Sequence, residues 1–260
     1  MAPRKPAPCR LDERLVRDGL AATVGEARAL VLAGRVVVGP HRCDKAGTSV
    51  RDEVPVRLAG APASRYVSRG GLKLEAGLAA LRLDVTGVHA LDVGASTGGF
   101  SDCLLQQGAA DVVAVDVGYG LLADRLRKDP RVTVRERTHA RALQPHEFAH
   151  PVDLAVMDVS FTGARALLPA VVPLLAQAGR VLVLVKPQFE AAREDVAAGG
   201  VVWDDAVRTQ AVDAVAHAAL LLGLREMARV DCAVPGPAGN REVFLLLERA
   251  TWAEAAPGFP

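Results

Sequence analysis

The sequence predicts an α/β protein in which a small α+β domain precedes a doubly wound, mostly parallel sheet. From residue 89 onward, short apolar runs with strand character alternate with amphipathic stretches of helical length, which is typical of a parallel sheet covered by helices on both faces. Before that point lie two helical stretches and a few short strands, followed by a linker-like segment at residues 60–64. A length of 260 residues accommodates two such domains.

The composition is that of a folded globular protein and excludes several other classes. Half of the residues are apolar and 23% are charged, so the chain as a whole is not disordered. The longest apolar stretches, 181–185 and the proline-broken 167–176, fall short of the roughly 18 residues that cross a bilayer. We therefore expect no membrane span. Residues 1–9 contain a basic pair without an apolar core, which indicates a disordered leader rather than a secretion signal.

Cysteine usage points to a reducing compartment. Cys9, Cys43, Cys103 and Cys232 are too scattered for a zinc pattern and too few for a disulfide scaffold. We expect reduced thiols, no bound metal and a cytoplasmic protein. The sequence leaves the oligomeric state open, and we expect a monomer.

Charge is distributed unevenly along the chain. Residues 1–82 hold 15 Lys and Arg against 8 Asp and Glu, whereas the remainder holds 16 against 22. The excess of positive charge in residues 1–82 favours binding of this part of the chain to a polyanion. The alternative is that the basic residues only make the surface soluble. Arginine outnumbers lysine 26 to 5. Because lysine can lose its proton and arginine effectively cannot, each lysine is a candidate for a role that needs an amine.

The first domain is predicted over residues 10–60. Apolar residues at helical spacing indicate two short helices, the second with Thr23 as N-cap and an end at Gly34. Residues 36–38 and 54–58 have strand character and enclose a turn-rich stretch at 39–47. Its arginines could form one RNA-facing surface, with Arg69 just beyond the linker; the candidates are Arg10, Arg14, Arg28, Arg35, Arg42 and Arg69.

The second domain is predicted over residues 69–250, after a linker at 61–68 and before a tail at 251–260. The expected strands are 89–93, 112–116, 132–135, 152–157, 181–185, 224–230 and 243–247. The expected helices between them include 100–107, 164–175 and 204–222. In sheets of this type, ligands bind at the carboxyl ends of the strands.

A glycine-rich loop follows the first of these strands. Gly94, Gly98 and Gly99 permit a tight turn, but their spacing does not fit the dinucleotide-binding pattern. A purely structural strand-to-helix turn is the alternative. Asp116 ends the second strand, where a carboxylate can accept hydrogen bonds from both ribose hydroxyls of an adenosine. Asp92 would then buttress the loop.

Four further polar residues stand where the sequence pattern predicts either loop or core. Asp158 and Lys186 each follow a strand and therefore share the edge of the sheet that carries the glycine loop. Glu242 precedes the strand at 243–247, so it reaches that edge only if this strand is antiparallel to the rest. Lys73 lies in the segment Ser68-Arg69-Gly70-Gly71-Leu72-Lys73-Leu74, just after the linker. Taken singly, the lysines could be solvated strand-end residues and Asp158 a turn residue.

These motifs resemble known families. Leu11-Asp12-Glu13-Arg14-Leu15 and the stretch 25–38 look like the S4 RNA-binding domain, and Asp92 to Phe100 with Asp116 is similar to the S-adenosylmethionine site of class I methyltransferases with a Rossmann-like fold. Over residues 10–249 the chain resembles the TlyA family of ribosomal RNA 2′-O-methyltransferases, many of which are labelled hemolysins. The motifs on which this resemblance rests include Met157-Asp158-Val159-Ser160-Phe161 and Val185-Lys186-Pro187-Gln188-Phe189-Glu190.

The resemblance implies a fold, a cofactor and site residues. It implies a seven-stranded sheet whose last strand is antiparallel, a ribosomal RNA or ribosomal-subunit substrate, and an approach of His139 to the adenine. It also implies that the interdomain linker influences cofactor binding; its residues are Arg65, Tyr66, Val67 and Ser68. The implied S-adenosylmethionine contacts are Asp92, Gly94, Ala95, Ser96, Thr97, Gly98, Gly99, Phe100 and Asp116.

A Lys-Asp-Lys-Glu set beside a methyl donor suits methylation of a ribose hydroxyl, which needs a proton acceptor. A free lysine side chain, with a pKa near 10.4, costs about 4.6 kcal/mol to deprotonate at pH 7, and burial beside another lysine lowers that cost. We assign Lys186 as general base, Asp158 and Lys73 as positioning groups, and Glu242 as a hydrogen-bonding partner. Two other classes compete with this enzyme: an RNA-binding protein whose methyltransferase domain is inactive, and a membrane-lytic hemolysin.

Overall fold

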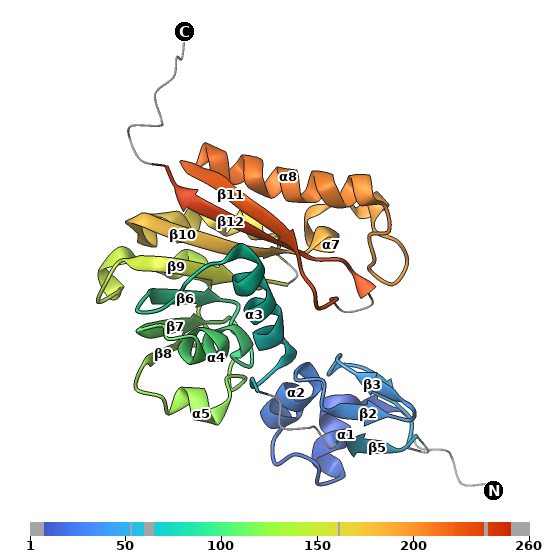
Figure 1. Ribbon diagram of the computed structural model, residues 1–260. Coiled ribbons are helices and arrows are strands. Elements are labelled where there is room, and N and C mark those ends of the chain that lie inside the picture. Colours follow the sequence, from blue (N-terminus) through green and yellow to red (C-terminus); the bar gives the residue numbers. More distant parts are fainter. Residues whose placement is uncertain (1–7, 53, 60–64, 161, 237–238, 251–260) are drawn as a thin grey trace, which may run out of the picture.

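Two domains are visible in the computed structural model, a small N-terminal one and a larger α/β one (Figure 1). The structure describes residues 8–52, 54–59, 65–160, 162–236 and 239–250. Most of the expected leader, residues 60–64 of the linker and the tail at 251–260 lie outside these residues. The leader prediction is wrong at Cys9, which belongs to strand β1 (Cys9–Arg10) and pairs with Val50 of β4 (Ser49–Val50).

The N-terminal domain packs two helices against a small antiparallel sheet. Helices α1 (Leu11–Arg17) and α2 (Val24–Leu32) meet the sheet through buried residues such as Leu15 and Val31. Thr23 caps α2 as predicted, because its Oγ1 accepts a hydrogen bond of 3.1 Å from the Glu26 amide. The sheet has the order β3-β2-β5; its strands are β2 (Val36–Val38), β3 (His41–Cys43) and β5 (Val56–Leu58).

Strand β3 corrects the expected turn-rich stretch at 39–47. Residues 41–43 pair antiparallel with β2, with Val38 opposite His41. Gly39 and Pro40 form the turn between β2 and β3, with a φ of +58° at Gly39, and a second turn lies at residues 46–47. The expected turn residues thus form a tight hairpin turn and a shorter loop on either side of β3.

The larger domain contains a seven-stranded sheet with the order β11-β12-β10-β9-β6-β7-β8. Strand β12 runs antiparallel to both β10 and β11, whereas the pairs joining β10, β9, β6, β7 and β8 are parallel. This confirms the predicted topology. The strands are β6 (His89–Val93), β7 (Asp111–Val115), β8 (Val132–Arg135), β9 (Val152–Met157), β10 (Leu175–Val185), β11 (Leu224–Asp231) and β12 (Val243–Arg249).

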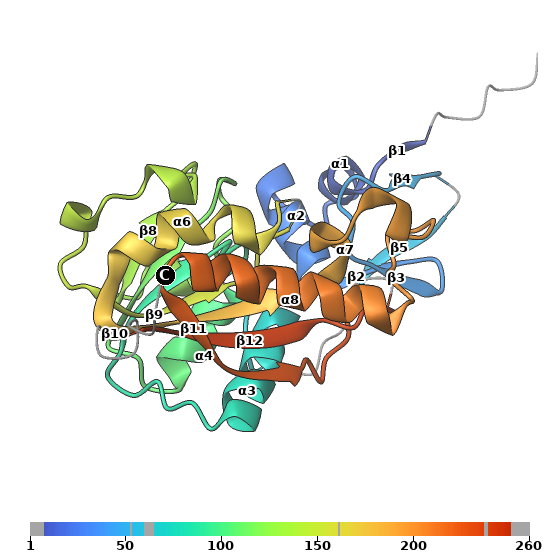
Figure 2. The same ribbon diagram turned by 90° about the horizontal axis from the view of Figure 1, so that it is seen from above.

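Helices cover both faces of this sheet, so two apolar cores form (Figures 1 and 2). One core includes Val212 of α8 and Leu168 of α6, and the other includes Leu74 of α3 and Leu104 of α4. The helices are α3 (Arg69–Leu81), α4 (Gly99–Gln106), α5 (Asp124–Arg127), α6 (Leu168–Val171), α7 (Pro187–Glu190) and α8 (Asp205–Leu221). Short 3-10 turns occur at Ala140–Ala142, Pro145–Glu147, Ala164–Ala166, Val172–Leu174 and Arg193–Asp195.

The expected single helix over 164–175 is wrong. The segment consists of a 3-10 turn, the four-residue α6 and a second 3-10 turn. Pro169 and Pro173 lack the amide hydrogen that a continuous helix needs, and Leu175 already belongs to β10. Within the described residues, no helix combines the length and apolar character needed to cross a bilayer.

Candidate active site

The glycine loop after β6 is folded tightly against the neighbouring strands. The amides of Gly94 and Ala95 both donate to the Val115 carbonyl, at 2.9 and 3.1 Å. Gly94 has a φ of +85°, and a Cβ there would lie 3.0 Å from the Asp158 carbonyl oxygen. Gly98 has a φ of +90°, and a Cβ there would overlap the Leu126 side chain. Glycine is therefore required at both positions.

Asp116 stands at the carboxyl end of β7 and closes one side of this loop. Its Oδ2 accepts a hydrogen bond of 2.8 Å from the Ser96 amide, and its Oδ1 accepts one of 2.6 Å from the Gly118 amide. Each carboxylate oxygen can accept more than one hydrogen bond. Both oxygens are thus oriented while retaining capacity for ligand hydroxyls.

Asp92 lies beneath the loop, fully buried, and does not line the cleft. Its Oδ2 accepts hydrogen bonds from the Ser101 amide at 2.9 Å and the Ser101 hydroxyl at 2.7 Å. These contacts tie the end of β6 to the first turn of α4. Burial raises the pKa of the Asp92 carboxyl to about 7, and repulsion by Asp158 and Asp116 acts in the same direction.

We expect Asp92→Asn to flatten the pH dependence of stability. Because the folded-state pKa of Asp92 is raised above its unfolded value, the folded protein holds an extra proton between about pH 4 and 7. The contribution of this group to stability is therefore present at low pH and is lost as pH rises through 7. Relative to the variant, the free energy of unfolding of the wild type should fall by on the order of 3 kcal/mol between pH 4.5 and 8.

Urea denaturation of both proteins at several pH values measures this difference. Asp84→Asn is a suitable control, because that exposed carboxyl has a lowered pKa, caused first by its hydrogen bond with the Thr86 amide. Parallel pH profiles for the wild type and Asp92→Asn would contradict the assignment of a protonated, buried Asp92.

Two adjoining cavities form one cleft above the carboxyl ends of the strands. Ser68, Arg69, Thr97 and Phe100 line the first, and Asp116, Leu121, Thr138 and His139 line the second. His139 is exposed and lies at the edge of the cleft. Five residues line both cavities, namely Leu32, Gly94, Ser96, Asp158 and Ser160.

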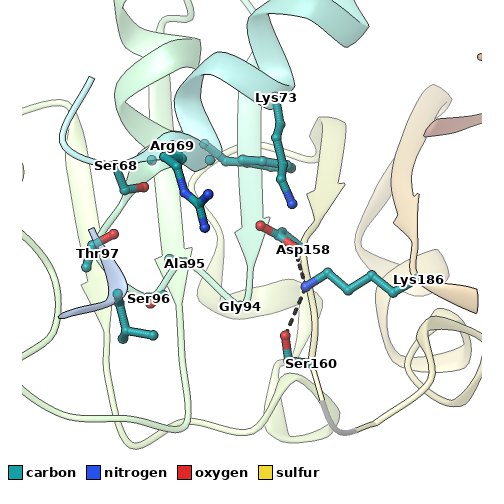
Figure 3. Close-up of a pocket in the computed structure, with 14 residues that line it drawn as sticks. Ser68, Arg69, Lys73, Gly94, Ala95, Ser96, Thr97, Asp158, Ser160 and Lys186 are labelled. Atoms are coloured by element: carbon teal, nitrogen blue, oxygen red, sulfur yellow. Dashed lines mark hydrogen bonds and ion pairs between the residues drawn. The ribbon is translucent and has the colours of Figure 1, made fainter. Parts of the chain in front are cut away.

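Two lysines point toward Asp158 from different sides of the cleft (Figure 3). The Nζ of Lys186 lies 2.6 Å from Asp158 Oδ1 and donates a hydrogen bond of 2.9 Å to Ser160 Oγ. The Nζ of Lys73 forms an ion pair of 2.5 Å with Glu242 Oε2. Both lysine side chains are only 10% exposed, so the two amines are held largely out of water.

Glu242 stands behind Lys73 and is absent from the cleft lining, with a side chain that is 0% exposed. It therefore orients Lys73 rather than facing a ligand. The antiparallel direction of β12, which begins at Val243, brings Glu242 to this edge of the sheet. The structure thus brings all four predicted catalytic residues together, as two ion pairs.

Sequence reasoning did not single out Ser160 or Asn240. Ser160 accepts the hydrogen bond from Lys186. Asn240 accepts from the Val202 amide at 3.0 Å and donates to the Gly200 carbonyl at 2.7 Å, which joins the segment before Glu242 to the loop before α8. Ser160 lies two residues after Asp158, and Asn240 lies two residues before Glu242. This closeness in sequence to predicted catalytic residues is the signal that could have identified both as hydrogen-bonding residues near the site. Among the described residues, no group of three or more His, Cys, Asp or Glu could hold a metal ion.

The linker residues 65–68 pack on α4 and fix the start of α3. The Val67 amide donates to Asp102 Oδ2 at 2.8 Å, and Gln106 Nε2 donates to the Arg65 carbonyl at 3.0 Å. Tyr66 is 1% exposed in the core of the larger domain. Ser68 and Arg69, which follow directly, line the cleft. The linker is therefore coupled mechanically to the cleft wall.

The candidate arginines differ in their surroundings. Arg14 does not lie on the exposed surface: its side chain is 10% exposed, forms a 2.5 Å ion pair with Asp18 and donates to the Arg51 carbonyl. It braces α1, which corrects the expected RNA-facing position. Arg10 and Arg28 both pair with Asp12 yet remain about half exposed. The others have exposed side chains; they are Arg35, Arg42 and Arg69.

Comparison with protein families gives two matches. A model described as FtsJ-like methyltransferase matches residues 66–249, and one described as S4 domain matches residues 9–55. The first match corresponds to the larger domain and the second to the N-terminal domain.

Individual relatives resemble the whole chain. The 16S/23S rRNA (cytidine-2′-O)-methyltransferase TlyA of Mycobacterium tuberculosis is 44% identical over 93% of this chain and 90% of its own length. Hemolysin A of Brachyspira hyodysenteriae is 34% identical over 90% of this chain and 97% of its own length. A hemolysin-named structure from Streptococcus thermophilus superposes with a TM-score of 0.71 at 38% identity, covering 94% of this chain and 89% of that one.

Proposed function

Since this chain belongs to the TlyA family of FtsJ-like methyltransferases, we propose that it methylates the ribose 2′-hydroxyl of cytidines in ribosomal RNA, with S-adenosylmethionine as methyl donor. One observation carries the proposal. The cleft places the Asp116 carboxylate and the glycine loop beside the buried Lys186 and its ion-pair partner Asp158, so a cofactor site adjoins a proton acceptor. With ribosomal RNA as substrate, we expect the enzyme to act in the cytoplasm.

The residues present fit the cofactor. Asp116 is oriented by two backbone amides and can accept hydrogen bonds from ribose hydroxyls. The loop from Gly94 to Phe100 brings backbone close to the ligand, and His139 borders the end of the cleft where the base would lie. When bound, S-adenosylmethionine supplies an activated methyl group on a sulfonium. Asp92 supports this loop from beneath.

Lys186 is the group best placed to accept the proton of the ribose hydroxyl. A neutral amine has two hydrogens and one lone pair, and Lys186 Nζ has an ion-pair partner, Asp158 Oδ1 at 2.6 Å, and a hydrogen-bond acceptor, Ser160 Oγ at 2.9 Å. With one hydrogen given to Ser160 and the other turned toward Asp158, the lone pair would be left for the substrate hydroxyl. The hydroxyl proton passes to Nζ as its oxygen becomes a nucleophile. Asp158 then stabilises the ammonium that forms.

Lys73 and Glu242 act as a second, supporting pair. Glu242 holds Lys73 at 2.5 Å, and Lys73 points toward Asp158 on the side opposite Lys186 (Figure 3). The pair therefore serves to position Asp158 beside Lys186.

The N-terminal domain would hold the RNA. Its exposed arginines can contact phosphates with five donors each. We assign this role to Arg10, Arg28, Arg35 and Arg42, together with Arg69 at the start of α3 in the larger domain, and Arg14 acts indirectly by bracing α1. Ribosomal RNA in a partly or fully assembled subunit would present the structured surface that such a domain grips.

The proposal is tested by Asp116→Ala. We expect the dissociation constant for S-adenosylmethionine to rise at least tenfold, because two oriented acceptors are lost, while the wild type transfers methyl groups to cytidine 2′-hydroxyls of ribosomal RNA. Isothermal titration measures the first quantity and mapping of 2′-O-methyl nucleotides the second.

Asp111→Ala provides the matched control. Asp111 begins the same strand, β7, but its side chain contacts His89 at the opposite end of the sheet. Undiminished cofactor binding by Asp116→Ala, or absence of ribose methylation by the wild type, would count against the proposed function.

A further inference from the structure

One wall of the cofactor cleft comes from the N-terminal domain. Leu32, the last residue of α2, lines both cavities, whereas the other lining residues all lie between Val67 and Pro187 in the chain. It lines the shared part of the cleft together with Ser96 and Asp158. Leu32 therefore stands where the Asp116 half of the cleft joins the Lys186 half.

Helix α2 approaches the larger domain at both of its ends. Near its beginning, a Cβ on Gly25 would lie 3.5 Å from the Gly120 carbonyl, in the loop that follows Asp116. Just beyond its end, a Cβ on Gly34 would lie 3.7 Å from Nε of Arg69, which itself lines the cleft. Figure 3 shows a blue, N-terminal ribbon segment beside Ser96 and Thr97. The helix is thus laid along the cleft.

An additional contact holds the two domains in this arrangement. Arg69 forms an ion pair of 3.7 Å with Asp44, which follows β3 of the N-terminal domain. Arg69 is also the first residue of α3, which carries Lys73 one turn later. The position of α2 over the cleft is therefore linked to the helix that supplies one of the two buried lysines.

Leu32 is one of the exposed apolar residues of α2. It is 41% exposed, although other apolar residues of α2 such as Ala27 and Val31 are fully buried in the N-terminal domain. An exposed leucine that faces a ligand cleft gains free energy when a ligand covers it. The second cavity that Leu32 lines already has apolar side chains, among them Val117 and Leu121, so Leu32 continues this apolar wall into the part of the cleft that the two cavities share.

From this placement we propose that Leu32 is a cofactor-contacting residue, supplied to the methyltransferase site by the RNA-binding domain. Its side chain packs against the central part of bound S-adenosylmethionine and shields the methyl-transfer position from water. The identity of the ligand rests on the proposed function. The cofactor site is complete only while α2 lies against the larger domain.

A series of substitutions at position 32 in the full-length chain tests this contact. We expect Leu32→Met to bind S-adenosylmethionine within about twofold of the wild type, because the apolar volume is conserved. Leu32→Ala should raise the dissociation constant about fivefold, and Leu32→Asp more than tenfold. Isothermal titration with S-adenosylmethionine gives the values, and thermal unfolding shows whether each variant is folded.

Val24→Ala is the matched control, since Val24 is an exposed apolar residue of the same helix that lines neither cavity. It should leave the dissociation constant unchanged. Equal affinities for the wild type, Leu32→Ala and Leu32→Asp would overturn the proposal, as would an equal loss in Val24→Ala. If Asp116→Ala binds weakly while the position-32 series binds normally, only the Leu32 contact fails. If Asp116→Ala also binds normally, the proposed cofactor site itself fails.

Discussion

Replacing Lys186 with arginine should reduce methyl transfer at least about a hundredfold while cofactor and RNA binding persist. Arginine keeps the positive charge and can still pair with Asp158, but it cannot lose a proton near neutral pH and so cannot accept one from the ribose hydroxyl. General-base catalysis contributes about 10² to 10⁴ in rate. The planar guanidinium is also larger than the ammonium that fits between Asp158 and Ser160.

Single-turnover transfer of a labelled methyl group to ribosomal subunits measures the rate, and titration measures cofactor affinity. Lys128→Arg is the control, because Lys128 is an exposed lysine of the same domain that lines neither cavity. Lys186→Ala adds a readout specific to a proton acceptor: added propylamine should restore part of the activity, and the rescue should grow as pH rises. Activity of Lys186→Arg within tenfold of the wild type would exclude Lys186 as the base.

The grouping of Asp116, Asp158 and Lys186 could be predicted from the sequence because it depends only on where strands end. Parallel strands present their carboxyl ends at one edge, so a polar residue directly after each apolar run must meet the others there. The strands before Asp116 and Asp158 end within a residue of the expected positions. The same rule places Glu242 at this edge if the last strand is antiparallel, because Glu242 precedes that strand. Strand β12 has this direction.

Contacts between distant segments could not be predicted in this way. Lys73 and Glu242 are 169 residues apart, and their pairing depends on how α3 packs across the end of β12. The burial of Arg14 depends on the fold of residues 51–52 against α1. Leu32 fits the apolar pattern of α2, and only the docking of that helix against the other domain places it at the cleft. The spacing of apolar residues along a helix shows which face of the helix is apolar, but it does not show which other element that face contacts.

Glu242→Leu should lower the free energy of unfolding by about 3–5 kcal/mol, because it leaves the Lys73 ammonium buried without its partner. The Glu242 side chain is 0% exposed and that of Lys73 is 10% exposed, so water replaces little of the lost interaction. The double variant Lys73→Met with Glu242→Leu removes both charges and conserves apolar volume. We expect it to recover most of the stability, since a buried ion pair and an apolar pair of similar size are often nearly equivalent.

In the double variant, we expect the free energy of unfolding to recover but the rate of methyl transfer to stay low. If Lys73 holds Asp158 in position beside Lys186, the stable double variant still lacks the amine that points toward Asp158 and should remain at least tenfold slower than the wild type. Urea denaturation and single-turnover methyl transfer measure the two quantities on the same preparations. Glu226→Leu, which removes a partner from the half-exposed pair with Arg229, should cost no more than about 1 kcal/mol. Full recovery of activity together with stability would reduce this pair to a structural role and leave catalysis to Lys186 and Asp158.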